Sequence, residues 1–111
     1  MMIKKPKSTT AKEKLTPFDY TLSIIGGKWK MKIMYQLAFE EVMRYGELKR
    51  RIPGITHKVL SSQLSEMERS GILKREEYQQ IPPKVEYSLL PRGKTLMPIL
   101  EEMCKWGVEN Q

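Results

Sequence analysis

The sequence predicts a mainly α-helical fold that carries one small β-hairpin. Within residues 44–90, two short segments with helical spacing of apolar residues precede two segments in which apolar and polar residues alternate. Helical spacing places apolar side chains along one side of a helix, whereas alternation places them on one face of a strand. Helix, turn, helix and hairpin, in this order, are typical of a winged helix-turn-helix domain.

Two further helices are predicted ahead of that region. Thr16 is a suitable N-cap and Pro17 suits the first helical position, so the first helix begins there and ends at Gly26-Gly27. The second helix is expected over residues 28–39, because its apolar residues recur at helical spacing: Trp29, Ile33 and Leu37.

The helix-turn-helix itself comes next. Leu48 and Ile52 lie one helical turn apart, and Pro53-Gly54 ends their helix. Thr56 can cap the following helix, which we expect over residues 56–70 because its apolar residues also keep helical spacing: Leu60, Leu64 and Met67. In such domains this second helix is the recognition helix, which enters the major groove of DNA.

A β-hairpin, the wing, is predicted after the recognition helix. Leu73, Arg75 and Glu77 occupy alternate positions before Pro82-Pro83, and the apolar residues Val85, Tyr87 and Leu89 do so after it. Residues 44–45 are expected to form a short strand that pairs with this hairpin. In a winged helix the hairpin contacts the DNA that flanks the recognition helix.

Residues 91–110 are expected to form one long closing helix with an apolar seam. Pro98 lies inside it and predicts a bend, because proline removes a hydrogen-bond donor and crowds the preceding turn. A compact winged helix has little room to bury this seam as well as the stripe of the first helix. We therefore expect a homodimer held by the first and last helices, through Phe18, Leu22, Leu96, Ile99, Leu100, Met103 and Trp106. The alternative is packing within one chain.

The net charge of +7 is unevenly distributed along the chain. Residues 44–75 hold eight basic side chains against three acidic ones, and residues 1–14 hold five against one. Residues 76–111 are net negative, with four basic and six acidic side chains. Positive charge concentrated on the predicted helix-turn-helix favours a polyanionic partner such as DNA. The alternative is a basic face that is solvated and contributes only to solubility.

The composition indicates one domain, residues 15–111, behind a flexible basic arm at residues 1–14. No apolar run approaches the roughly 20 residues of a membrane span. A single Cys fits a reducing cytoplasm, and one His with one Cys cannot furnish the usual zinc site. Without a glycine-rich phosphate loop or a paired nucleophile and base, the chain is not expected to be an enzyme or to hold a cofactor.

The expected DNA contacts fall into two groups. Base contacts are assigned to the outward face of the recognition helix: Thr56, His57, Lys58, Ser61, Ser62 and Ser65. Wing and backbone contacts are assigned mainly to basic side chains: Lys84, Gln80, Lys30, Arg44, Lys49 and Arg50. A winged helix used only for protein–protein assembly is the alternative, and the polar outward face of residues 56–70 argues against it.

Taken in order, these segments resemble the HxlR-type winged-helix transcriptional regulators of bacteria, within the MarR-like superfamily. The match spans roughly residues 17–107, and its segments are residues 23–30, Tyr45 before Gly46-Glu47-Leu48, and residues 52–56, 71–73, 82–89 and 104–107. The resemblance implies a cytoplasmic homodimer that binds a pseudo-palindromic operator and regulates transcription. It also implies that an effector can exist, because several relatives respond to electrophiles, aldehydes or oxidants.

The chain departs from this family at one position that matters for sensing. Many members place a Cys immediately before the first-helix proline, where this chain has Thr16. Cys104 matches a Cys position in the family's last helix. It is either a small apolar residue buried at the dimer seam or a thiol sensor activated by Lys105.

Overall fold

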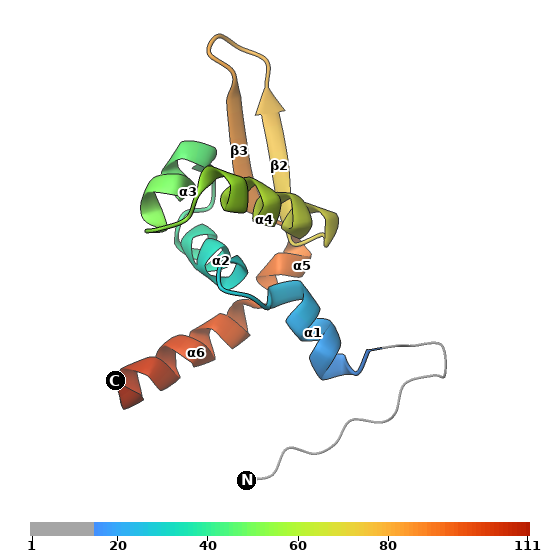
Figure 1. Cartoon of the computed structure of the whole chain (residues 1–111), viewed down its shortest axis with the longest axis vertical. Coiled ribbons are helices and arrows are strands. Elements are labelled where there is room, and N and C mark those ends of the chain that lie inside the picture. The colour runs from blue at the N-terminus through green and yellow to red at the C-terminus, as the bar shows by residue number, and fades with distance from the viewer. Residues whose placement is uncertain (1–14) are drawn as a thin grey trace.

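The computed structural model describes residues 15–111, and the predicted arm at residues 1–14 lies outside the described residues. The hairpin projects from one end of the domain, whereas the first and last helices diverge at the other (Figure 1). Along the chain the elements are α1 (Pro17–Ile25), α2 (Lys30–Phe39), β1 (Met43–Arg44), α3 (Tyr45–Arg51), α4 (His57–Arg69), β2 (Leu73–Tyr78), β3 (Lys84–Leu89), α5 (Pro91–Lys94) and α6 (Met97–Asn110). The predicted winged helix-turn-helix fold is confirmed.

Local capping sets the starts of α1 and α4, as predicted. The Thr16 hydroxyl oxygen accepts a hydrogen bond of 3.1 Å from the Asp19 backbone N–H. The Thr56 hydroxyl oxygen accepts one of the same length from the Val59 backbone N–H. Each bond satisfies an amide that has no partner inside its helix, so both helix starts are encoded locally.

The three strands form an antiparallel sheet in the order β1-β3-β2. Met43 pairs with Tyr87, which in turn pairs with Arg75 on the other side. The predicted short strand therefore pairs with the hairpin, but one residue earlier than expected, because Tyr45 already begins α3.

The core lies where α2, α3 and α4 meet the root of the sheet. Its fully buried side chains come from all of these elements: Ile33, Met34, Met43, Leu48, Leu60, Leu64, Met67, Ile72 and Leu73. The apolar stripe predicted for α4 is thus buried, which turns the opposite, polar side of α4 toward solvent.

The prediction of one long closing helix was wrong. The chain forms two helices, α5 and α6, and Thr95 and Leu96 lie between them. Pro98 falls in the first turn of α6, where a backbone N–H has no intrahelical acceptor and its loss costs nothing. Proline therefore begins a helix here instead of bending one.

Gly93 of α5 is expected to be indispensable for packing α5 on the domain. A Cβ at this position would overlap the Ile72 carbonyl oxygen, which is fixed by a 2.9 Å hydrogen bond from the Leu90 N–H. We expect Gly93→Ala to lower the free energy of unfolding by about 1–3 kcal/mol, measured by urea denaturation. Gly46→Ala in α3 is the control, because its Cβ would meet its nearest neighbour at 3.5 Å. Equal urea midpoints for the two variants would contradict this packing.

Candidate nucleic-acid interface

The outward side of α4 carries the residues expected to read bases. His57, Lys58 and Ser61 lie in its first turns and are exposed, and Ser62 and Ser65 continue the same polar surface. Thr56, also expected to contact a base, serves as the N-cap of α4 through its bond to Val59. The backbone N–H groups at this helix start favour an anion such as a phosphate.

Tyr45, the first residue of α3, meets the start of α4. Its hydroxyl oxygen lies 3.1 Å from each of three atoms: Nδ1 of His57, the backbone carbonyl oxygen of His57 and Oγ of Ser61. The Tyr45 and His57 rings are stacked, with centroids 5.7 Å apart and planes inclined by 8°. The partners of Tyr45 lie 12 and 16 residues away in the sequence, so no local spacing predicts a contact role for it.

Basic side chains at the end of β1, on α3 and at the start of α4 form the electropositive part of this surface. Arg44, Arg50 and Lys58 are exposed, and Lys49 is half-buried. Within residues 15–111, none of these four forms an ion pair with a carboxylate. Their charges are thus available to phosphates, and the assignment of Arg44, Lys49 and Arg50 as backbone contacts stays a prediction.

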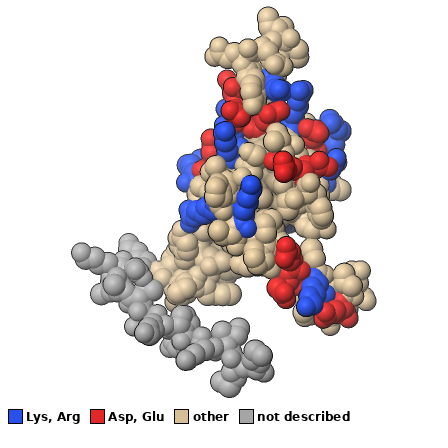
Figure 2. Space-filling view, turned by 180° about the vertical axis from the view of Figure 1, so that it is seen from behind, with Lys and Arg blue, Asp and Glu red and all other residues tan. Residues whose placement is uncertain are grey.

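The wing, in contrast, neutralises its own charge. Lys74 pairs with Glu76 at 3.6 Å, Arg75 with Glu77 at 3.0 Å, and Lys84 with Glu86 at 3.6 Å. Figure 2 accordingly shows acidic and basic side chains interleaved around the hairpin, below a tip without charges.

The wing residues assigned to DNA differ in accessibility. The Lys84 side chain is only 22% exposed, because it also lies over the Tyr78 ring at 4.4 Å. A hydrogen bond to Glu76 raises the pKa of Tyr78 to about 12, so this phenol stays protonated. Gln80, near the tip, is exposed. A phosphate contact by Lys84 must therefore compete with Glu86, which predicts a weaker contribution than that of Lys58.

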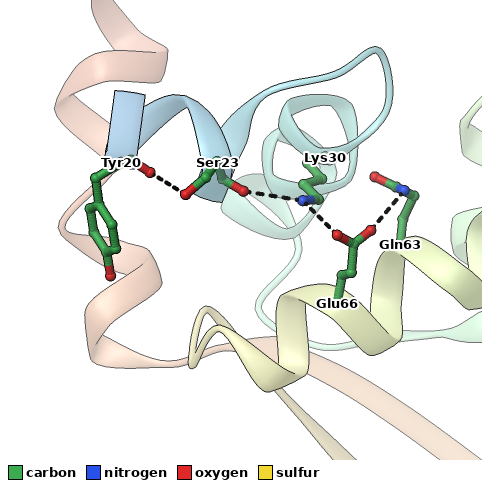
Figure 3. Close-up of polar contacts among 5 residues, drawn as sticks. All are labelled: Tyr20, Ser23, Lys30, Gln63 and Glu66. Carbon is green, nitrogen blue, oxygen red and sulfur yellow. Dashed lines mark hydrogen bonds and ion pairs between the residues drawn. The ribbon is translucent and has the colours of Figure 1, made fainter. Parts of the chain in front are cut away.

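The assignment of Lys30 as a phosphate contact is corrected by the structure. Its side chain is 9% exposed, and its ammonium lies 3.4 Å from both a Glu66 carboxylate oxygen on α4 and the Ser23 carbonyl oxygen on α1. Gln63 donates to the other Glu66 oxygen at 3.3 Å. Figure 3 shows Lys30 bridging the end of α1 and the C-terminal half of α4. Lys30 therefore fixes the recognition helix against α1 from inside the protein.

We expect the two halves of this ion pair to respond unequally to mutation. Glu66→Ala leaves the desolvated Lys30 ammonium without its counter-charge and should lower the free energy of unfolding by about 1–2 kcal/mol. Lys30→Met should cost less, because Glu66 is 44% exposed and water can solvate it. Urea denaturation measures both values. In the double variant, the decrease in the free energy of unfolding should equal that of Lys30→Met alone. A decrease equal to the sum of the two single variants would contradict the pairing.

The terminal helices carry the apolar surface expected to form a dimer. Several of its residues are exposed in the protomer: Phe18, Leu22, Ile99, Met103 and Trp106. Figure 2 shows uncharged surface over α1. Leu100 is corrected to a core residue at 7% exposure, and Leu96 is half-buried against the core, so these two stabilise the protomer itself. The dimer contacts of the exposed residues stay a prediction.

Cys104 lies on the side of α6 that faces α2 and α3. The thiol is exposed and borders a hollow of about 410 Å³, whose other lining residues include Met31, Tyr35, Arg51 and Leu100. Burial of the thiol at a dimer seam therefore requires a second chain. Over residues 15–111, no three His, Cys, Asp or Glu residues are grouped to hold a metal ion. None of the helices described has the length and apolar character of a membrane span.

Comparisons with known proteins identify the family. The HxlR-like helix-turn-helix family matches residues 24–111. An uncharacterized HTH-type transcriptional regulator of Halalkalibacterium halodurans is 64% identical over 96 residues, which cover 86% of this chain and 85% of the relative.

Solved structures are similar over most of the chain. The redox regulator HypR in its oxidized form is 46% identical, with a TM-score of 0.81, over 86% of this chain and 98% of that one. A MarR-family transcriptional regulator from Porphyromonas gingivalis is 38% identical, with a TM-score of 0.83, over 93% of this chain and all of its own. The predicted resemblance is confirmed, and the chain belongs to the HxlR-like helix-turn-helix family.

Proposed function

We propose that this protein is a sequence-specific, DNA-binding transcriptional regulator that acts in the cytoplasm. The observation that carries the proposal is the two-sided character of α4. One side is buried through Leu60, Leu64 and Met67, and the other exposes short polar side chains together with Lys58. A helix held in this way, with its polar N-terminal turns outward, suits the major groove of DNA. The relatives named as HTH-type transcriptional regulators support the same function.

We further propose that the regulator binds as a homodimer to a pseudo-palindromic operator. In the protomer Phe18 is 69% exposed and Trp106 is 68% exposed, on two helices that project away from the core. Such side chains on projecting helices are expected to be covered by a partner. A two-fold dimer presents two copies of α4 to two half-sites, so the operator should repeat in inverted orientation.

Assembly with another protein, without DNA, is the competing function. An assembly surface would place large aromatic or aliphatic residues on the exposed side of α4. That side instead carries His57, Lys58, Ser61, Ser62 and Ser65, next to Lys49 and Arg50 of α3, which form no ion pair within residues 15–111. The chemistry of α4 therefore favours a nucleic acid.

The proposal is tested by capture of genomic DNA. Sheared DNA of the source organism is incubated with the purified protein, and bound fragments are sequenced. We expect a small set of fragments that share an inverted repeat. Uniform recovery of the genome, with no shared sequence, would contradict sequence-specific binding. Capture repeated at high salt serves as the control, because non-specific binding to phosphates is lost first.

A further inference from the structure

Tyr45 contacts His57 and Ser61, two residues in the first two turns of α4 on its exposed polar side, called here the reading side. Its hydroxyl is 3.1 Å from His57 Nδ1, from the His57 carbonyl oxygen and from Ser61 Oγ. The parallel stack of the Tyr45 and His57 rings fixes the plane of the imidazole. Because Tyr45 is half-buried at the start of α3, the position of these groups is set from inside the domain.

The number of protons decides the direction of each hydrogen bond. A tyrosine hydroxyl has one hydrogen and two lone pairs, and a backbone carbonyl can only accept. All three contacts can be hydrogen bonds at once only if the hydrogen goes to the His57 carbonyl, which leaves the Tyr45 oxygen as the acceptor for both remaining contacts. His57 must then carry its proton on Nδ1, and the Ser61 hydroxyl must point its hydrogen at Tyr45.

This pattern determines which hydrogen bonds α4 can still offer. With Nδ1 protonated, the outer nitrogen of the neutral His57 ring, Nε2, is an acceptor. Ser61, which gives its hydrogen to Tyr45, likewise keeps only lone pairs. Both side chains are exposed on the reading side of α4. In the major groove, acceptors pair with the amino groups of adenine N6 and cytosine N4, and not with guanine or thymine oxygens.

We propose that Tyr45 is a specificity-determining residue: its hydroxyl makes His57 and Ser61 hydrogen-bond acceptors, so the bases they face are adenine or cytosine. This inference rests on the proposed function and names the bases that the site selects. Phenylalanine at position 45 would keep the ring stack but release both side chains, which could then also donate to guanine or thymine. The role of Tyr45 is therefore to position and polarise two reading residues.

The first test needs no DNA. The chain has one histidine, so its ring nitrogens give a single set of ¹⁵N signals. At about pH 8 we expect Nδ1 protonated and Nε2 unprotonated in the intact protein. Tyr45→Phe should shift the ring toward the Nε2-protonated tautomer, whereas Tyr35→Phe on α2 should not. A predominantly Nε2-protonated ring in the wild type would overturn the inference.

The second test is selection of operators from a randomised duplex library. We expect the wild type to select adenine or cytosine at the positions facing His57 and Ser61. With Tyr45→Phe this preference should fall about three- to tenfold, as expected for one hydrogen bond, while the urea midpoint and the salt dependence stay unchanged. In the background of His57→Ala and Ser61→Ala, the same substitution should have no further effect.

The outcomes separate this inference from the proposed function. If the wild type selects no motif at all, sequence-specific DNA binding fails and the inference fails with it. If the wild type selects a motif that Tyr45→Phe reproduces with the same base frequencies, only the inference is overturned. Tyr35→Phe is the matched control, since it removes the same hydroxyl from a ring that packs against Phe39 on α2.

Discussion

Lys58→Ala is expected to lower affinity for the operator and to weaken the preference for one base. Lys58 is exposed in the first turn of α4 and pairs with no carboxylate within residues 15–111, so its ammonium can reach a guanine O6 or N7. Such a base contact contributes about 1–3 kcal/mol of discrimination, or roughly 5- to 150-fold. A competition assay between operator and random duplex measures the loss.

Lys84→Ala and Lys105→Ala serve as graded comparisons for this result. Lys84 is held by Glu86 and Tyr78, so its loss should weaken all duplexes alike and reduce the salt slope by at most about one unit. Lys105, on α6, should leave DNA binding nearly unchanged. If Lys58→Ala lost affinity equally on operator and random duplex, Lys58 would be a phosphate contact and not a reader of bases.

Trp106→Glu is expected to convert the proposed homodimer to monomers. The wild type should sediment at twice 13.0 kDa at micromolar concentration, because its exposed apolar residues on α1 and α6 are then covered by a second chain. A carboxylate at position 106 would have to be desolvated in that interface, which disfavours association. Loss of the second half-site should also lower operator affinity by about a hundredfold or more. Analytical ultracentrifugation and operator titration measure the two effects.

Ile81→Glu is the matched control for the dimer prediction. Ile81 is fully exposed near the tip of the wing, at the opposite end of the domain from α1 and α6 (Figure 1), so the same charge there should leave the mass unchanged. A wild type that sediments at 13.0 kDa, or a Trp106→Glu variant that remains dimeric, would contradict the proposed interface.

The fold was predictable because its signals are local. Thr16 and Thr56 each form the capping bond that their helix needs within three residues, and the alternation of Val85, Tyr87 and Leu89 with polar residues indicated the second wing strand. Pro98 led to the wrong prediction of one bent closing helix, because proline is compatible both with a bend inside a helix and with the first turn of a new helix. The arrangement in space decided between them, since the chain packs Gly93 against Ile72 before α6 begins.

The candidate site was predictable only in part, for a physical reason. Helical spacing identifies which side of α4 faces outward, but it does not say which charges are already neutralised. Lys30 and Glu66 are 36 residues apart, and only the packing of α2 on α4 brings them together. The contacts of Tyr45 depend on the turn between α3 and α4 in the same way. Contacts between side chains on different helices or strands can therefore be identified only from the structure.

Sequence-specific recognition by α4 is tested most directly by one titration. An operator recovered from genomic capture and a random duplex of equal length are titrated with the wild type at two salt concentrations. We expect the operator to bind at least about a thousandfold more tightly, with the ratio maintained as salt rises. Equal affinities for both duplexes, falling together with salt, would show that the protein binds phosphates alone and would contradict recognition through α4.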